Sequence, residues 1–227
     1  MAESGYASST VVKSSSAKSS IILEEKKVYT ILKRGMDVIG ATLGLICLSW
    51  LFLIVAILIK LEDPTGTVFF KQIRVGKNGK KFYMYKFRSM VSNAEEQLKD
   101  LLKYNEIEGA MFKLKNDPRV TKIGRFIRKT SVDELPQLWN VLKGEMSLVG
   151  PRPPLPREVK QYSTYDKQRL LVLPGCTGLW QVSGRNNLSF KEMVELDLEY
   201  IKVRSLSLDI KIILKTFIII VKNNDAF

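Results

Sequence analysis

The sequence of 227 residues has room for one globular domain with an appendage, because single domains commonly contain about 100 to 200 residues. Lysine and arginine total 36 against 23 acidic residues, a formal net charge of +13, which favours polyanionic partners such as nucleic acid, anionic lipid or phosphorylated substrates. Histidine is absent, which excludes Ser-His-Asp and Cys-His catalysis and histidine-ligated zinc. The two cysteines form no CxxC pair and indicate neither a disulfide framework nor a zinc site.

The N-terminal segment is rich in serine and lacks the sustained apolar core of a secretory signal, so we expect a disordered polar tail over residues 1–30. An apolar run, VIGATLGLICLSWLFLIVAILI, follows at residues 38–59 and carries no formal charge. As a helix it would extend about 33 Å, enough to cross the hydrocarbon core of a bilayer. This composition predicts a membrane-inserted helix.

Basic residues flank both ends of the apolar run, so the positive-inside rule gives it no orientation. A straight span is the simpler interpretation. A helix that bends near its middle and leaves by the face through which it entered would satisfy both flanks. Ser49 is the evident weak point, because a serine hydroxyl can bond a carbonyl one turn back and bend the helix. Both arrangements remain open on these residues alone.

Two runs of residues, 68–75 and 80–87, flank an Asn-Gly dipeptide, which is favoured in tight turns. They predict a short β-hairpin. Lys86 and Arg88 would then share one face of the second strand, either as an ordinary solvated face or as part of an anion site.

A basic segment follows. Asp117-Pro118 predicts an N-cap and a first-turn proline that open a helix. Lys122, Arg125 and Arg128 recur every three residues and would form a cationic ridge on that helix. Such a ridge is either a solvated face or a surface that meets an acidic or phosphorylated group.

The adjacent carboxylates Asp133 and Glu134 stand at the predicted start of the next helix, where free backbone N–H groups favour the ionised form and lower a carboxyl pKa. One interpretation is structural: Asp133 is an N-cap, and Ser131-x-x-Glu134 is a capping box. The other is chemical. Arginines lie on both sides in the sequence, and an ionised carboxylate with a lowered pKa suits a nucleophile beside bound phosphates.

Two later turns carry further arginines. The sequence GPRPP at residues 150–154 is a rigid turn that fixes Arg152, whose planar guanidinium suits bidentate contact with phosphate. A glycine-punctuated loop at residues 174–187 carries Arg185, and such a loop can bring backbone N–H groups close to an anion. Neither a Walker sequence nor GxGxxG is present, so an ATP-dependent or dinucleotide-dependent enzyme is not indicated.

Residues 210–221 are dominated by isoleucine, and Lys211, Lys215 and Lys222 fall on one stripe of a helical wheel. This pattern predicts either of two helices. One lies at a membrane interface with its lysines reaching lipid phosphates, and the other is a core helix with a single wet stripe.

Taken together, these motifs resemble one family. The apolar entry segment, KFRSM at residues 86–90, the run at 130–153 and the loop PGCTGLWQVSGRN are similar to those of the bacterial sugar transferases. These are monotopic polyprenyl-phosphate sugar-phosphate transferases that begin exopolysaccharide, capsule and glycan assembly. The resemblance covers roughly residues 30–223 without the additional N-terminal membrane spans of larger members, which implies the minimal catalytic form.

The resemblance implies transfer of a sugar 1-phosphate from a UDP-sugar to polyprenyl (undecaprenyl) phosphate, with release of UMP. Asp133 would attack the β-phosphorus to give a phosphosugar-enzyme intermediate, which the lipid phosphate resolves, and Glu134 would assist. Mg²⁺ is the implied cofactor, held by Asp133 with Glu134 as an optional second ligand. The implied phosphate-binding residues are Lys86, Arg88, Arg128, Arg152 and Arg185.

We therefore expect an α/β fold, mostly helical around a small β-hairpin, with the polar tail at residues 1–30, a membrane-inserted helix at 31–62 and a catalytic domain at 63–227 that ends in an interfacial helix. The family's membrane segment is broken by Ser-Pro and is re-entrant, whereas here Ser49-Trp50 lacks the proline. Because UDP-sugars are cytosolic, the re-entrant arrangement remains the expectation, at the bacterial cytoplasmic membrane with the catalytic domain on the cytoplasmic face. The sugar is not specified, and a homodimer is left open.

Two other classes of function compete with this interpretation. The net charge favours a membrane-tethered basic protein that binds nucleic acid or anionic surfaces, but two carboxylates at the centre of its basic region would oppose that binding. A scaffold would use the same motifs only as caps and turns. The enzyme interpretation uses the carboxylates and predicts no nucleic-acid partner.

Overall fold

The computed structural model describes residues 26–106, 114, 116–184 and 188–222. Within these ranges the fold is mostly helical and contains two small two-stranded sheets. This confirms the mostly helical part of the expected fold class. The predicted tail at residues 1–30 lies almost entirely outside the described residues.

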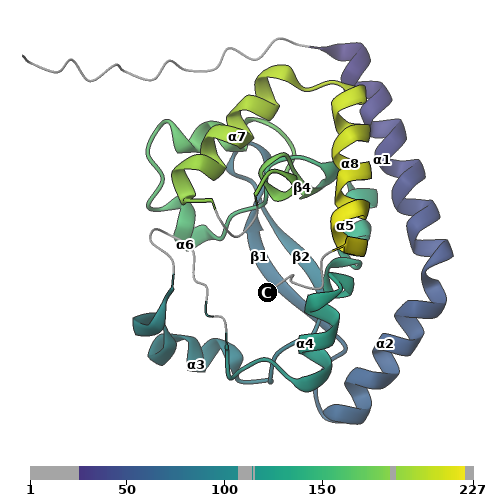
Figure 1. The fold of residues 1–227 in the computed structure, drawn as a ribbon, viewed down its shortest axis with the longest axis vertical. Helices are drawn as coiled ribbons and strands as arrows, with labels where there is room; N and C mark the ends of the chain where they lie inside the picture. The colour runs from purple at the N-terminus through teal and green to yellow at the C-terminus, as the bar shows by residue number, and fades with distance from the viewer. Residues whose placement is uncertain (1–25, 107–113, 115, 185–187, 223–227) are drawn as a thin grey trace, which may run out of the picture.

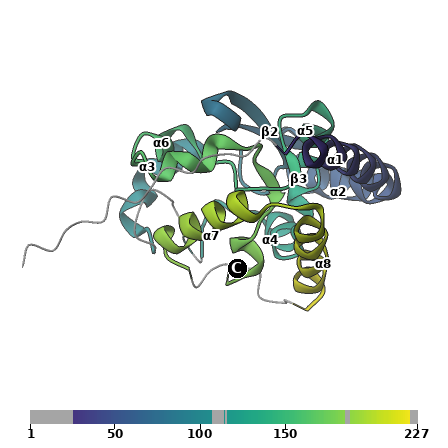
Figure 2. The ribbon, with the colours of Figure 1, turned by 90° about the horizontal axis from the view of Figure 1, so that it is seen from above.

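The apolar N-terminal segment forms two helices, α1 (Lys27–Cys47) and α2 (Ser49–Glu62), which lie along one edge of the molecule in both views (Figure 1, Figure 2). The two helices are bent by 59° relative to each other. The Ser49 hydroxyl donates to the Ile46 carbonyl at 2.8 Å, so the bend expected near Ser49 is confirmed without a proline. Among the described helices, none alone has the length and apolar composition to cross a membrane, whereas this bent pair meets both criteria together.

Polar side chains attach α1 to the centre of the fold. Arg34 donates to two carbonyls in the last turn of helix α5 (Gln137–Lys143), at 2.6 and 2.8 Å, and so satisfies groups that a helix end leaves unpaired. Buried Asp37 accepts from the Ser147 hydroxyl and from the next backbone N–H, both at 2.9 Å. Because Asp37 is buried and both side chains are paired, α1 is held in one position against the elements that follow it in the chain.

The predicted hairpin is confirmed. Strands β1 (Phe69–Val75) and β2 (Lys81–Phe87) pair antiparallel near the centre of the molecule (Figure 1). The predicted Asn-Gly turn is confirmed within a short 3-10 segment at Lys77–Gly79, because the Lys80 N–H closes the turn on the Lys77 carbonyl at 3.2 Å. Asn78 and Gly79 do adopt the positive φ values, 55° and 79°, that such residues tolerate best.

The hairpin register decides which side chains share a face. Arg74 pairs with Phe82, and Lys86 pairs with Phe70. Alternate residues of a strand point to the same side, so Phe82, Met84 and Lys86 lie on the face that also carries Arg74. Two cations therefore project from one side of this small sheet.

The basic helix begins later than predicted. Helix α4 spans Lys122–Lys129, and its N-cap is Thr121, whose hydroxyl accepts from the Gly124 N–H at 2.9 Å. Asp117, the predicted cap, instead pairs with Arg119 Nη2 at 2.6 Å. A turn rather than a helix follows Asp117, because the neighbouring guanidinium takes the carboxylate that would have capped the helix.

A second sheet, which the sequence analysis did not predict, pairs β3 (Ser147–Val149) with β4 (Gly175–Thr177) in parallel. Gly175 makes this close pairing possible, since a Cβ there would lie 2.0 Å from the Gly150 nitrogen. The other α-helices among the described residues are α3 (Ala94–Leu101), α6 (Pro156–Val159), α7 (Phe190–Val203) and α8 (Leu206–Lys222).

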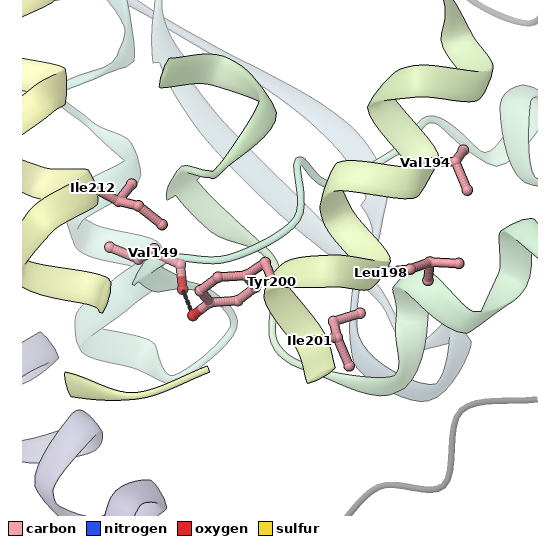
Figure 3. Packing of buried hydrophobic residues seen from close by; sticks show 6 residues of the cluster. All are labelled: Val149, Val194, Leu198, Tyr200, Ile201 and Ile212. Carbon is pink, nitrogen blue, oxygen red and sulfur yellow. Dashed lines mark hydrogen bonds between the residues drawn. The ribbon is translucent and has the colours of Figure 1, made fainter. Parts of the chain in front are cut away.

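The main hydrophobic core lies between β3, α7 and α8, as Figure 3 shows. The Tyr200 hydroxyl lies within this core, 3.2 Å from the Val149 carbonyl and 2.8 Å from Asp209 Oδ1. Lys33 of α1 pairs with the other oxygen of Asp209 at 2.8 Å. One buried carboxylate thus connects α1, α7 and α8. The residues drawn in Figure 3 are Val149, Val194, Leu198, Tyr200, Ile201 and Ile212.

Helix α8 is covered on only one narrow side. Over its described length only Asp209 and Ile212 are buried, whereas Leu214, Phe217 and Val221 are more than half exposed. The alternative of a core helix with a single wet stripe is therefore wrong, because large apolar side chains lie outside the protein core together with the lysines.

Candidate active site

The two adjacent carboxylates lie in a 3-10 turn, Val132–Glu134, ahead of helix α5. Ser131 precedes this turn with a left-handed φ of 57° and makes no side-chain capping bond. Helix α5 begins only at Gln137, so Asp133 does not cap it. The interpretation of Ser131 and Glu134 as a capping box is therefore wrong, and both carboxylates are left to other partners.

Lys86 reaches both carboxylates from the hairpin. Its Nζ lies 2.6 Å from Glu134 Oε1 and 3.9 Å from Asp133 Oδ2. Buried Asn140 of α5 holds strand β2 beside the turn, because its amide donates to and accepts from the strand backbone at 2.7 and 3.1 Å. These main-chain contacts fix the strand that carries Lys86, and the ion pair with Glu134 holds its side-chain nitrogen.

The two carboxylates differ in ionisation. Burial raises the pKa of Asp133 to about 6, against the opposing charge of Lys86, and the neighbouring negative charge of Glu134 adds to the rise. The predicted lowering of this pKa is wrong, because Asp133 is only 6% exposed and the loss of water outweighs an ammonium 3.9 Å away. Partial burial also acts to raise the pKa of Glu134, but Lys86 and Arg152 lower it to about 2. One carboxylate is firmly ionised and the other titrates close to neutral pH.

Arg128 approaches Asp133 from helix α4. Its Nε donates to the Ser89 hydroxyl at 2.8 Å, and Asp133 supports its positive charge against the effect of burial. Gly124 allows helix α4 to lie close to Ser89, because a Cβ at Gly124 would lie 2.0 Å from the Ser89 carbonyl oxygen. The other two residues of the predicted cationic ridge are exposed to solvent, so the structure directs only Arg128 towards the carboxylates.

Arg88 lies in a different set of contacts. Strand β2 ends at Phe87, and the Arg88 N–H continues its pairing by donating to the Val68 carbonyl at 2.9 Å. The Arg88 guanidinium pairs with Asp63 Oδ2 at 3.2 Å and donates to the Ser92 hydroxyl at 3.3 Å. These contacts hold the segment after α2 against the strand end.

A small open pocket adjoins Glu134, and Lys86 and Arg152 are among the other residues that line it. Arg152 follows β3 in the rigid proline turn and acts on the charge of Glu134. Arg185, the remaining predicted phosphate-binding residue, lies outside the described residues. Of the five predicted cations, the structure thus gathers Lys86, Arg128 and Arg152 around the carboxylates.

Sequence reasoning missed Arg74, which also lines this pocket and is 6% exposed. Its terminal nitrogens donate to the Pro153 carbonyl at 2.9 Å and to Gln72 Oε1 at 2.8 Å. The signal that could have found it is alternation, because the hairpin places Arg74 on the same face as Lys86.

The donor atoms at this site fit Mg²⁺. The described residues contain no group of three or more acidic, histidine or cysteine side chains able to hold a metal ion. Mg²⁺ bound with substrate phosphates commonly uses only one or two carboxylates, and water and phosphate oxygens complete its shell. Asp133 and Glu134 provide such a pair. Lys86 already lies 2.6 Å from one Glu134 oxygen, which favours Asp133 as the first ligand.

Comparison with known proteins agrees with these motifs. The family model described as bacterial sugar transferase matches residues 28–223. Galactosyl transferase CpsE of Streptococcus agalactiae is 51% identical over 88% of this chain and 44% of its own length. Undecaprenyl-phosphate galactose phosphotransferase of Salmonella typhimurium is 46% identical over 89% of this chain and 43% of its own length. Exopolysaccharide production protein ExoY of Rhizobium meliloti is 44% identical over 81% of this chain and 83% of its own length. The chain thus spans less than half the length of the first two relatives. It belongs to the bacterial sugar transferase family.

Proposed function

We propose that this protein transfers a sugar 1-phosphate from a UDP-sugar to polyprenyl phosphate and releases UMP, as the first membrane step of exopolysaccharide, capsule or glycan assembly. The observation that carries the proposal is one buried carboxylate, Asp133, beside Lys86 and Arg128 and next in the chain to Glu134, which lines a cationic pocket. The Streptococcus relative is a galactosyl transferase and the Salmonella relative a galactose phosphotransferase, so UDP-galactose is the first donor to test.

The reaction needs two displacements at one phosphorus. Asp133 Oδ attacks the β-phosphorus of the UDP-sugar, and the bond from that phosphorus to the bridging oxygen breaks as UMP leaves. An oxygen of polyprenyl phosphate then attacks the same phosphorus and frees Asp133, which leaves a polyprenyl-diphosphate sugar. A pKa of about 6 suits this role, because the group is ionised at neutral pH yet more nucleophilic than an ordinary aspartate.

The surrounding cations provide most of the remaining catalysis. Phosphoryl transfer depends mainly on positioning and on neutralising charge at phosphate oxygens. Lys86, Arg128 and Arg152 supply fixed positive charge, and the ionised Glu134 keeps Lys86 in place at 2.6 Å. Mg²⁺ held by Asp133, with Glu134 as a second ligand, would neutralise further phosphate charge when bound.

We also propose that α1, α2 and α8 place the protein in the cytoplasmic leaflet of the bacterial cytoplasmic membrane. The bent pair exposes large apolar side chains along both of its helices, including Ile39 at 62%, Trp50 at 60% and Leu53 at 64%. The apolar exposure of α8 adds a second surface of the same kind. A bent insertion keeps both flanks on one face, so the site meets UDP-sugars from the cytosol and a lipid phosphate at headgroup level.

The experiment is incubation of membranes containing the protein with undecaprenyl phosphate, Mg²⁺ and a panel of UDP-sugars that begins with UDP-galactose. We expect UMP release, an enzyme adduct of the mass of one phosphosugar when the lipid is omitted, and loss of both with EDTA. Asp133→Asn should abolish adduct and turnover, whereas Asp166→Asn, the same change at an aspartate engaged with Ser163, should retain them. Full activity of Asp133→Asn, or no UMP release from any UDP-sugar tested, would contradict the proposal.

Sidedness has its own test. Single cysteines introduced ahead of α1 and after α2, in a background with Cys47→Ser and Cys176→Ser, are labelled with a membrane-impermeant maleimide in sealed right-side-out and inside-out vesicles. The bent arrangement predicts that both sites react only in inside-out vesicles. Labelling of the two sites from opposite faces would establish a span and refute the re-entrant proposal.

A further inference from the structure

Arg74 is a buried cation with an unusual distribution of hydrogen bonds. Its two terminal nitrogens are committed to Pro153 and Gln72, and both contacts are shorter than 3 Å. Its Nε–H is buried and has no hydrogen-bond partner among the described residues. A buried donor without a partner carries a desolvation penalty, and such a donor on the wall of a pocket indicates a ligand atom that accepts from it.

The charges around Arg74 also indicate an anionic ligand. Arg74, Lys86 and Arg152 line the same pocket, and Glu134 is the only carboxylate among the described lining residues. Arg152 and Arg74 lie close enough for their charges to oppose each other. Such a surplus of positive charge in a partly enclosed site is relieved when an anion binds there.

We propose that the Arg74 Nε–H donates a hydrogen bond to a phosphate oxygen of the substrate bound in this pocket. Its terminal nitrogens meanwhile hold the proline turn that carries Arg152, so one buried residue contacts the ligand and positions a second arginine. The inference rests on the proposed function for the nature of the ligand. A phosphate oxygen is common to the nucleotide sugar and the lipid phosphate, so both are tested.

The experiment measures the affinity of purified protein in detergent for UDP and, separately, for a short-chain polyprenyl phosphate by titration calorimetry. Arg74→Lys retains the charge but removes the guanidinium N–H, and we expect its affinity for at least one of these ligands to fall about tenfold or more. Arg169→Lys is the matched control, since Arg169 is equally buried but engages Asp197 and Tyr162. Its affinities should stay within twofold of those of the wild type.

A measurement on the wild-type protein separates ligand contact from a purely structural role and does not depend on folding of the variant. With arginine labelled by ¹⁵N, the Nε–H signal of Arg74 should move downfield, and its exchange with water should slow, when the ligand is added. An unshifted signal under saturating amounts of both ligands, or unchanged affinities in Arg74→Lys, would overturn the inference. UMP release by the wild type tests the proposed function independently, so the two ideas can fail separately.

Discussion

Removal of the Lys86 charge should shift the pH dependence of the reaction. In the proposed mechanism Asp133 acts as an ionised nucleophile, and its pKa of about 6 already includes the support of the Lys86 ammonium. Lys86→Gln removes that support and leaves two adjacent carboxylates with less positive charge beside them. The ionised form of Asp133 becomes less favourable, so its pKa rises. As the pH is lowered, the variant therefore loses activity at a higher pH than the wild type does.

The size of the shift follows from the geometry. Two unit charges 3.9 Å apart interact by about 4 kcal/mol at an effective dielectric constant of about 20, which corresponds to about three pKa units. Lys86 is 19% exposed, and Arg128 remains beside Asp133, so we expect a rise of about one to two units. With a pKa near 7.5, only about a tenth of the variant is ionised at pH 6.5, against about three quarters of the wild type, an eightfold difference in rate.

The assay is UMP release at subsaturating donor across pH 5 to 9.5, because kcat/KM reports the pKa values of the free enzyme. Lys86 is also expected to bind phosphate, so the height of the profile will fall, but the midpoint of its acid limb is independent of that loss. Lys143→Gln, which removes a surface pair with Glu145 at 2.7 Å, provides the control and should leave the midpoint unchanged. A Lys86→Gln profile with the wild-type midpoint would falsify the assignment of the acid limb to Asp133.

Three further predictions concern stability, read as thermal midpoints or denaturant curves in detergent. The folded pKa of Asp133 lies above its ordinary value of 3.8, so ionisation of this side chain destabilises the fold above about pH 6 but not below about pH 4. Asp133→Asn should therefore stabilise the protein by about 1–3 kcal/mol at pH 8 and leave its stability unchanged at about pH 4. Equal destabilisation at these two pH values would refute this. Gly175→Ala places a Cβ 2.0 Å from the Gly150 nitrogen and should lower the free energy of unfolding by about 2 kcal/mol or more, which lowers the thermal midpoint. An unchanged midpoint would contradict this, because it would mean that β3 and β4 move apart without loss of stability. Asp209→Asn leaves Lys33 without its buried partner and should cost about 3 kcal/mol, which a loss below 1 kcal/mol would contradict.

Local sequence signals predicted the elements that depend on near neighbours. A single serine located the bend of the N-terminal pair, because the hydroxyl of Ser49 competes for a carbonyl only three residues away. The Asn-Gly dipeptide between two short runs located the hairpin, whose register is set between strands close together in the chain. The parallel pair of β3 and β4 gave no such signal, since each strand has three residues and the partners are far apart in sequence. The start of α4 was misplaced because Arg119 takes the carboxylate of Asp117.

The site residues were predicted from their neighbours in the chain. The prediction failed for properties that depend on burial in the folded protein. Adjacent carboxylates with arginines on either side were sufficient to single out Asp133 and Glu134. The direction of the Asp133 pKa could not be obtained in this way, because it depends on how much water the folded protein removes from the side chain. Arg74 was missed because its importance arises from sharing a pocket with Arg152, which comes from a turn far along the chain.

The attachment of α1 bears on the proposed placement, in which one site meets a water-soluble donor and a lipid acceptor at a single depth. Arg34 holds the end of α5, whose start follows the carboxylate turn, and Asp37 holds β3, which leads directly into the turn of Arg152. Both sides of the phosphate pocket are therefore fastened to the same helix that, in the proposed placement, enters the lipid. Movement of that helix along the membrane normal would carry the pocket with it, so in the proposed placement the apolar length of the bent pair would set the height at which Asp133 meets the lipid phosphate.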